Sequence, residues 1–139
     1  MESTSGRRSK WVIAVAALTA CYWLAMFVGT HWPIAPDPNR IPNSLDKLQH
    51  LTAFAGLALL LCTSGAAWGF STRQLLLGVL GLIAVYGVFD ELTQAFVPHR
   101  EPDIRDWLAN MLGASLGVSI FLILQQAVVA GWQRRSKVA

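Results

Sequence analysis

The sequence has few charged residues for its length. Only 14% of its 139 residues are charged and 54% are apolar, whereas an ordinary soluble domain has about 25% charged residues. A length of 139 residues allows one domain. This composition argues against a soluble globular protein and indicates a chain whose solvent is the lipid bilayer.

Cysteine and histidine are also scarce, which argues against several kinds of site. Cys21 and Cys62 lie inside apolar runs without C-x-x-C spacing, so they predict neither a disulfide framework nor a zinc site. His31, His50 and His99 stand on separate segments without an H-E-x-x-H pattern, and the sequence therefore predicts no metal and no other cofactor. A serine hydrolase is not indicated either, because the G-x-S-x-G pattern is missing.

The excess of basic residues does not indicate a nucleic-acid partner. The formal net charge is +3, but the Lys and Arg residues stand at the ends of apolar segments. A nucleic-acid interface usually shows a basic face, often interleaved with aromatic residues. The sequence has no such face, so we expect no nucleic acid among its partners.

Four apolar runs are long enough to cross a membrane. They are residues 11–30, 51–68, 75–89 and 107–132. About twenty helical residues, at 1.5 Å each, cross a hydrocarbon core of about 30 Å. The third run is short and must extend towards Val97, which places Asp90 and Glu91 inside the outer edge of the membrane. The sequence predicts an all-α protein, a bundle of four transmembrane helices.

A lipoprotein signal is an alternative interpretation of the first run. Arg7, Arg8 and Lys10 precede an apolar stretch that leads to Leu18-Thr19-Ala20-Cys21, which resembles a cleavage site with its lipidated cysteine. A lipoprotein would continue with a polar tether, whereas residues 22–28 stay apolar. An uncleaved membrane span is therefore the preferred interpretation.

The distribution of basic residues predicts the orientation of the bundle. Seven of them fall on one predicted side, namely Arg7, Arg8, Lys10, Arg73, Arg134, Arg135 and Lys137. Four fall on the other, namely Arg40, Lys47, Arg100 and Arg105. Because cytoplasmic loops are enriched in Lys and Arg, both termini are expected in the cytoplasm. The predicted organisation is a cytoplasmic tail over residues 1–10, a membrane domain over 11–132 and a basic cytoplasmic tail over 133–139.

Polar residues gather at the predicted outer ends of the second, third and fourth spans. Spacings of three and four residues place them on shared helix faces. The candidate cluster consists of Asp46, Lys47, His50, Asp90, Glu91, Gln94, Arg100, Asp103, Asp106 and Asn110. Because such groups avoid lipid, we expect the stripes to turn inward and to form a polar pocket that opens to the outside.

A purely structural interpretation also exists for several of these residues. Asp103 follows a proline and is a good N-cap candidate, and Asp106 would lie in the first helical turn, where the dipole favours a carboxylate. Lys47 can simply neutralise a neighbouring acid. Asp90 and Glu91 resist this explanation, because they lie near the C-terminal end of a span. There the dipole disfavours negative charge, so these acids indicate a function or a specific pairing.

The order and spacing of these residues resemble the VanZ-like membrane protein family. The resemblance lies in Asp46-Lys47-Leu48-Gln49-His50, in Asp90-Glu91-Leu92-Thr93-Gln94, and in Arg100, Asp103, Asp106 and Asn110 after Pro98. It covers residues 11–125, including the arrangement of four spans. The family usually has a glycine before the arginine, where this chain has His99, so a loop that relies on a positive φ would have to adjust.

The resemblance implies a multi-pass protein of the bacterial plasma (inner) membrane. The family is similar to proteins associated with resistance to teicoplanin-type glycopeptides. It thus implies a protein of the cell envelope that alters the access of such lipoglycopeptides, or of lipid-linked wall precursors, at the outer membrane face. The expected partners are the lipid bilayer and an amphiphilic or lipid-linked ligand. The oligomeric state stays open.

The sequence is compatible with two other functions. One is an enzyme that acts on a lipid headgroup or other amphiphile, with His50 as general acid or base and Asp90, Glu91 or Asp106 orienting it or holding a divalent ion. The other is a small transporter, which is disfavoured because the middle of the membrane domain lacks ionisable residues. The sequence leaves open whether the protein is catalytic.

Overall fold

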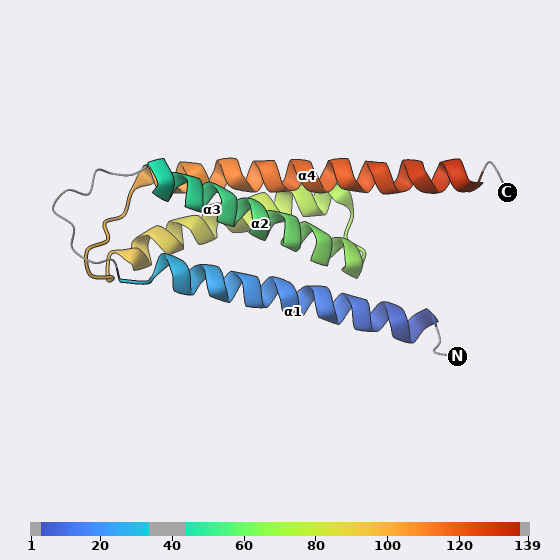
Figure 1. Ribbon diagram of the computed structural model, residues 1–139, viewed down its shortest axis with the longest axis horizontal. Coiled ribbons are helices and arrows are strands. Elements are labelled where there is room, and N and C mark those ends of the chain that lie inside the picture. Colours follow the sequence, from blue (N-terminus) through green and yellow to red (C-terminus); the bar gives the residue numbers. More distant parts are fainter. Residues whose placement is uncertain (1–3, 34–43, 137–139) are drawn as a thin grey trace.

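The computed structural model of the protein describes residues 4–33 and 44–136. They form four helices, α1 (Thr4–Thr30), α2 (Ser44–Trp68), α3 (Thr72–Gln94) and α4 (Ile104–Ser136). The helices lie side by side, and the first turn of α1 and the last turn of α4 are at the same end of the bundle (Figure 1). Each helix is long and apolar enough to cross a membrane. The prediction of an all-α bundle of four spans is confirmed.

The outer surface of the bundle is apolar and part of its interior is polar. Large apolar side chains are exposed on every helix, among them Leu24, Leu48, Val85 and Leu112. Asn110, in contrast, is fully buried. This distribution suits a lipid solvent, because apolar side chains lose nothing by facing acyl chains whereas polar groups must be satisfied inside the protein. The chain is a multi-pass membrane protein.

The closest helix pair is α2 and α4, and small residues make their approach possible. A Cβ atom on Gly113 would collide with the backbone oxygen of Leu51, and one on Gly117 would collide with that of Ala55. The G-x-x-x-G pattern of α4 therefore lies directly against the backbone of α2, which is the usual role of this spacing in membrane helices. The contact brings His50, the residue before Leu51, next to α4.

The inner face of α3 changes from apolar to polar along one stripe. Its buried residues are Leu75, Val79, Ile83, Gly87, Asp90, Glu91 and Gln94. Most of these positions are three or four residues apart, so they share one face of the helix. The packing that buries Leu75, Val79 and Ile83 therefore also carries Asp90 into the interior, one turn from the end of α3.

The helices are longer than the apolar runs that predicted them. Helices α2 and α4 begin several residues before the predicted starts at 51 and 107, because their first turns contain Asp46 and Asp106, and acids are favoured at helix N-termini. Helices α1 and α4 also continue into the segments assigned to the tails, 1–10 and 133–139. Of the segment that joins α1 to α2, residues 34–43 lie outside the described residues.

The loop between α3 and α4 keeps a glycine-like conformation at His99. The φ angle of this residue is 65°, which lies in the left-handed region that L-residues other than Asn, Asp and His seldom adopt. The expectation that histidine would force this loop to adjust was therefore wrong at this position. The backbone keeps the left-handed turn, and the side chain of His99 is exposed.

Candidate functional site

Lys47 of α2 joins two acids at the start of α4. Its Nζ atom lies 2.9 Å from Oδ2 of Asp103 and 2.8 Å from Oδ1 of Asp106. Asp103 also caps α4, because its Oδ1 accepts the backbone N–H of Arg105 at 2.8 Å. This bond and the Lys47 ammonium lower the pKa of Asp103 from its ordinary value. The structural interpretation of Lys47, Asp103 and Asp106 as a cap and a neutralised pair is thus confirmed.

His50 of α2 and Asn110 of α4 form a buried hydrogen bond. His50 Nδ1 lies 3.0 Å from Asn110 Oδ1, and the two residues are 3% and 0% exposed. A carboxamide oxygen only accepts hydrogen bonds, so the imidazole donates from Nδ1–H. In the neutral ring Nε2 then keeps its lone pair. The pair with Asn110 therefore prepares His50 to accept a proton or to bind a cation through Nε2.

Asp90 of α3 is fully buried and accepts hydrogen bonds from neutral groups. Thr30 Oγ1 donates to its Oδ1 at 3.0 Å and Gln94 Nε2 donates to its Oδ2 at 3.0 Å. Tyr86 donates more weakly, with 3.4 Å between its hydroxyl oxygen and Oδ1. These bonds hold the carboxylate in one orientation, but none of them brings a positive charge.

The end of α1 contributes two residues that the sequence did not assign to the cluster. Thr30 bonds directly to Asp90, and His31 Nδ1 lies 3.9 Å from Asp90 Oδ1. His31 Nε2 also lies 2.8 Å from Thr93 Oγ1 on α3. A signal for both was present, because Thr30 ends the first apolar run and His31 follows it, so both reach the same membrane depth as the cluster.

Glu91 of α3 is almost buried, and only one of its two carboxylate oxygens has a hydrogen-bond partner among the described residues. Its Oε2 accepts the backbone N–H of Asp103 at 3.1 Å, and the residue is 6% exposed. Its Oε1 is buried and has no hydrogen-bond partner among the described residues, and the same holds for Nδ2 of Asn110. Buried polar atoms are usually paired, so these two atoms are an acceptor and a donor that a further group could satisfy.

The stripes of α2, α3 and α4 meet at His50. One nitrogen of His50 and one carboxylate oxygen each of Asp90 and Glu91 all lie within 4.8 Å of one another. The same is true of His50, Asp46 and Asp106. The structure thus brings these predicted residues together, and Lys47, Gln94, Asp103 and Asn110 contact the group. Arg100 does not contact these acids; its Nε donates to the backbone oxygen of Trp32 at 3.4 Å.

A cleft of about 240 Å³ lies beside this cluster. It is lined by Met26, Gly29, Thr30, Asp46, Gln49, His50, Ala53 and Arg100. These residues come from α1, α2 and the connection between α3 and α4. His50 belongs to both the cleft and the buried group, so a molecule in the cleft reaches the cluster through this imidazole. Arg100, which forms no ion pair with a described acid, lines the same cleft.

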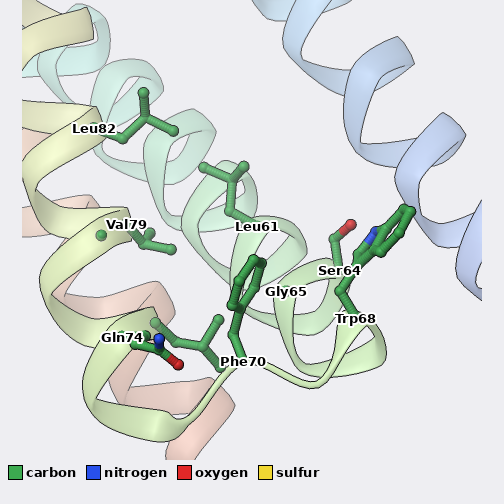
Figure 2. A pocket seen from close by; sticks show the side chains of 10 residues that line it. Leu61, Ser64, Gly65, Trp68, Phe70, Gln74, Val79 and Leu82 are labelled. Carbon is green, nitrogen blue, oxygen red and sulfur yellow. The ribbon is translucent and has the colours of Figure 1, made fainter.

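A second cleft, of about 390 Å³, lies at the other end of α2, near its turn into α3. Figure 2 shows Leu61 and Trp68 of α2 and Val79 and Leu82 of α3 around it, with Phe70 of the turn between the two helices. None of its lining residues is titratable. Its lining is mostly apolar, so the candidate site is the polar cleft at the opposite end.

One of three comparisons with known proteins found a match. The family model described as VanZ/LLP1 matches residues 3–125, which include all four helices up to the middle of the last one and every residue of the cluster. No curated protein and no solved structure matches the chain. The match covers most of the chain, and the resemblance found in the motifs of α2, α3 and α4 is confirmed. The chain belongs to the VanZ/LLP1 family.

Proposed function

We propose that this protein binds the polar headgroup of a lipid-linked wall precursor at the outer face of the bacterial plasma membrane. It thereby alters the access of teicoplanin-type lipoglycopeptides to that face. The observation that carries the proposal is the polar cleft, which lies between the lipid-facing surfaces of α1 and α2 and a buried cluster of His50, Asp90 and Glu91.

The charge distribution supports an external position for the cleft. Arg73 is in the first turn of α3, and Arg134 and Arg135 are in the last turn of α4. These turns are at the end of the bundle that holds the first turn of α1 (Figure 1), whereas the cleft is at the opposite end. Basic residues favour the cytoplasmic side. The termini are then cytoplasmic and the cleft faces outward, where both wall precursors and lipoglycopeptides meet the membrane.

The volume and chemistry of the cleft favour the precursor as its occupant. About 240 Å³ is below the roughly 300–1,000 Å³ of sites for drug-sized molecules, so the cleft holds part of a headgroup and not an entire glycopeptide. Arg100 can pair with a phosphate oxygen, and Asp46 and Gln49 can bond to sugar hydroxyls. The lipid tail would lie along exposed apolar residues such as Val28 and Leu48.

The test compares drug susceptibility in a sensitive Gram-positive host that expresses wild type, Arg100→Gln or Arg105→Gln at equal membrane abundance. Arg105 is the matched control, because it is exposed in the same region and does not line the cleft. We expect wild type and Arg105→Gln to raise the inhibitory concentration of teicoplanin but not of vancomycin, which lacks a lipid tail. Arg100→Gln should lose the effect.

The proposal fails if wild type protects no better than an empty vector, and also if Arg100→Gln protects as well as wild type. Binding of a lipid-linked precursor to the purified protein in nanodiscs separates its two parts. If the precursor binds but the protein gives no protection, the proposed ligand is supported and the proposed role in resistance is refuted. If teicoplanin binds and the precursor does not, the proposed ligand is refuted and teicoplanin takes its place.

A second candidate function is an enzyme that hydrolyses a phosphoester in such a headgroup. The geometry of His50 favours it, because one ring nitrogen lies within 4.8 Å of carboxylate oxygens of Asp90 and Glu91 and the bond from Nδ1 to Asn110 leaves Nε2 its lone pair. In this reaction a water oxygen bonds to phosphorus, the bond from phosphorus to the leaving oxygen breaks, His50 takes the water proton, and a proton ends on the leaving alcohol. Turnover that is lost in His50→Gln and kept in His99→Asn supports this function. Equal turnover in both variants would exclude His50 as the base.

A further inference from the structure

The buried acids of α3 have no lysine or arginine partner among the described residues, and the basic side chain nearest to Asp90 there is His31, whose Nδ1 lies 3.9 Å from Oδ1 and is charged only when protonated. Lys47 pairs with Asp103 and Asp106 and is therefore already engaged. In residues 4–33 and 44–136, no Lys or Arg forms an ion pair with Asp90 or Glu91. Two uncompensated carboxylates inside a membrane domain are costly. A bound cation, protons on the acids, or a protonated His31 beside Asp90 would offset this cost.

The positions of the donor atoms suit a cation. A nitrogen of His50 and carboxylate oxygens of Asp90 and Glu91 lie within 4.8 Å of one another, and ligand atoms on one ion are at most roughly 4–5 Å apart. The three residues come from two helices that are fixed by their packing and are 3%, 0% and 6% exposed. A small closure would place all three on one ion.

Two further features of these residues leave a position for a ligand. Glu91 Oε1 is buried and has no hydrogen-bond partner in the described part of the chain, so an acceptor is left for a ligand. His50 donates from Nδ1 to Asn110, which directs the lone pair of Nε2 to the other side of the ring. Metal-binding histidines are generally held in this way by a second hydrogen-bonded residue. The sequence predicted no metal because its three histidines lie on separate segments without H-E-x-x-H spacing, and it allowed a divalent ion on Asp90, Glu91 or Asp106 only for the enzyme alternative.

We propose that His50, Asp90 and Glu91 bind a divalent first-row transition ion, such as Mn²⁺ or Zn²⁺, inside the outer end of the bundle. One imidazole with carboxylates suits these ions better than Ca²⁺ or Mg²⁺, which prefer oxygen ligands alone. The ion neutralises the two carboxylates and ties α2 to α3. Through His50 it also stands next to the cleft, where it would attract an anionic headgroup.

The experiment uses the full chain, purified in detergent and treated with a chelator. Mn²⁺ binding is measured by electron paramagnetic resonance, and Zn²⁺ binding by calorimetry, each together with the thermal midpoint. We expect wild type to bind one ion with an increase in midpoint. Glu91→Gln and Asp90→Asn should weaken binding at least tenfold, because each removes a charged ligand while keeping its shape. Glu101→Gln, an exposed acid of the neighbouring loop, should bind as wild type.

The proposal is overturned if chelator-treated wild type, folded by circular dichroism, binds neither ion, which would mean that protons on the acids or on His31 offset the charge. It is also overturned if Glu91→Gln and Asp90→Asn are folded and bind as tightly as wild type. Should one variant fail to fold, the other and the wild-type titration still decide. Ion binding needs no amphiphile, so this result is independent of the proposed precursor binding, which is measured separately with and without chelator.

Discussion

Lys47 on α2 and Asp106 on α4 form an ion pair across the closest helix interface of the bundle. Their Nζ and Oδ1 atoms are 2.8 Å apart, and the side chains are 32% and 8% exposed. The lysine side chain is thus partly exposed, and the aspartate side chain is nearly buried. Removing the lysine leaves a buried carboxylate without its cation, which is the costly way to break such a pair.

We therefore predict that Lys47→Gln lowers the free energy of unfolding by roughly 1–3 kcal/mol, less than for a fully buried pair because the lysine is partly solvated. The double variant Lys47→Gln/Asp106→Asn should recover much of this loss. Thermal unfolding in detergent measures both. Arg73→Gln serves as the control for the removal of a cation. Additive losses in the double variant would show that the pair has no coupling energy.

The lowered pKa of Asp103 makes the stability of the protein depend on pH. Its ordinary value is 3.8, and the Arg105 backbone N–H and Lys47 lower it. A group with a depressed pKa contributes its stability above its ordinary pKa and loses it as the pH falls through the folded pKa. Wild type should therefore exceed Asp103→Asn in thermal midpoint at pH 6, and the difference should vanish as the pH falls below 3.8. Asn also caps helices, so a difference that persists at low pH would contradict a charge effect.

Gly113 should tolerate no larger side chain. A Cβ atom there meets the backbone oxygen of Leu51, which cannot rotate away as a side chain could, so α2 and α4 would have to separate. We predict that Gly113→Ala lowers the free energy of unfolding by about 1–3 kcal/mol. Gly131→Ala on the same helix meets nothing within 4 Å and should be neutral or slightly stabilising. Equal midpoints for the two variants would contradict the close contact.

The left-handed backbone of His99 predicts an unusual order of stability. At a φ of 65°, glycine is unstrained, whereas a β-branched residue costs about 1–2 kcal/mol. His99→Gly should be at least as stable as wild type, and His99→Val should be less stable by about that amount. Residue Glu101, whose φ is not positive, should show the opposite order for the same two substitutions. The same order at both positions would refute the strain argument.

The sequence already determined the membrane character, the four spans and the family. The membrane character and the spans follow from local composition, because an apolar run of about twenty residues can satisfy its backbone in lipid only as a helix. The family follows from the order and spacing of the polar residues. Spacings of three and four residues also placed Asp46 with His50 and Asp90 with Gln94 on shared faces. The ends of the helices were less well determined, since Asp46 and Asp106 are polar yet lie within first turns.

The tertiary structure alone decided which polar residues meet. The sequence could not show that Lys47 reaches Asp106, that His50 bonds to Asn110, or that Thr30 of α1 donates to Asp90, because each pair is about sixty residues apart in the chain. These contacts depend on the approach of α2 and α4 at Gly113 and on the depth at which α1 ends. Spacing along one helix is local, whereas a site shared by several helices is fixed only when their packing sets rotation and register.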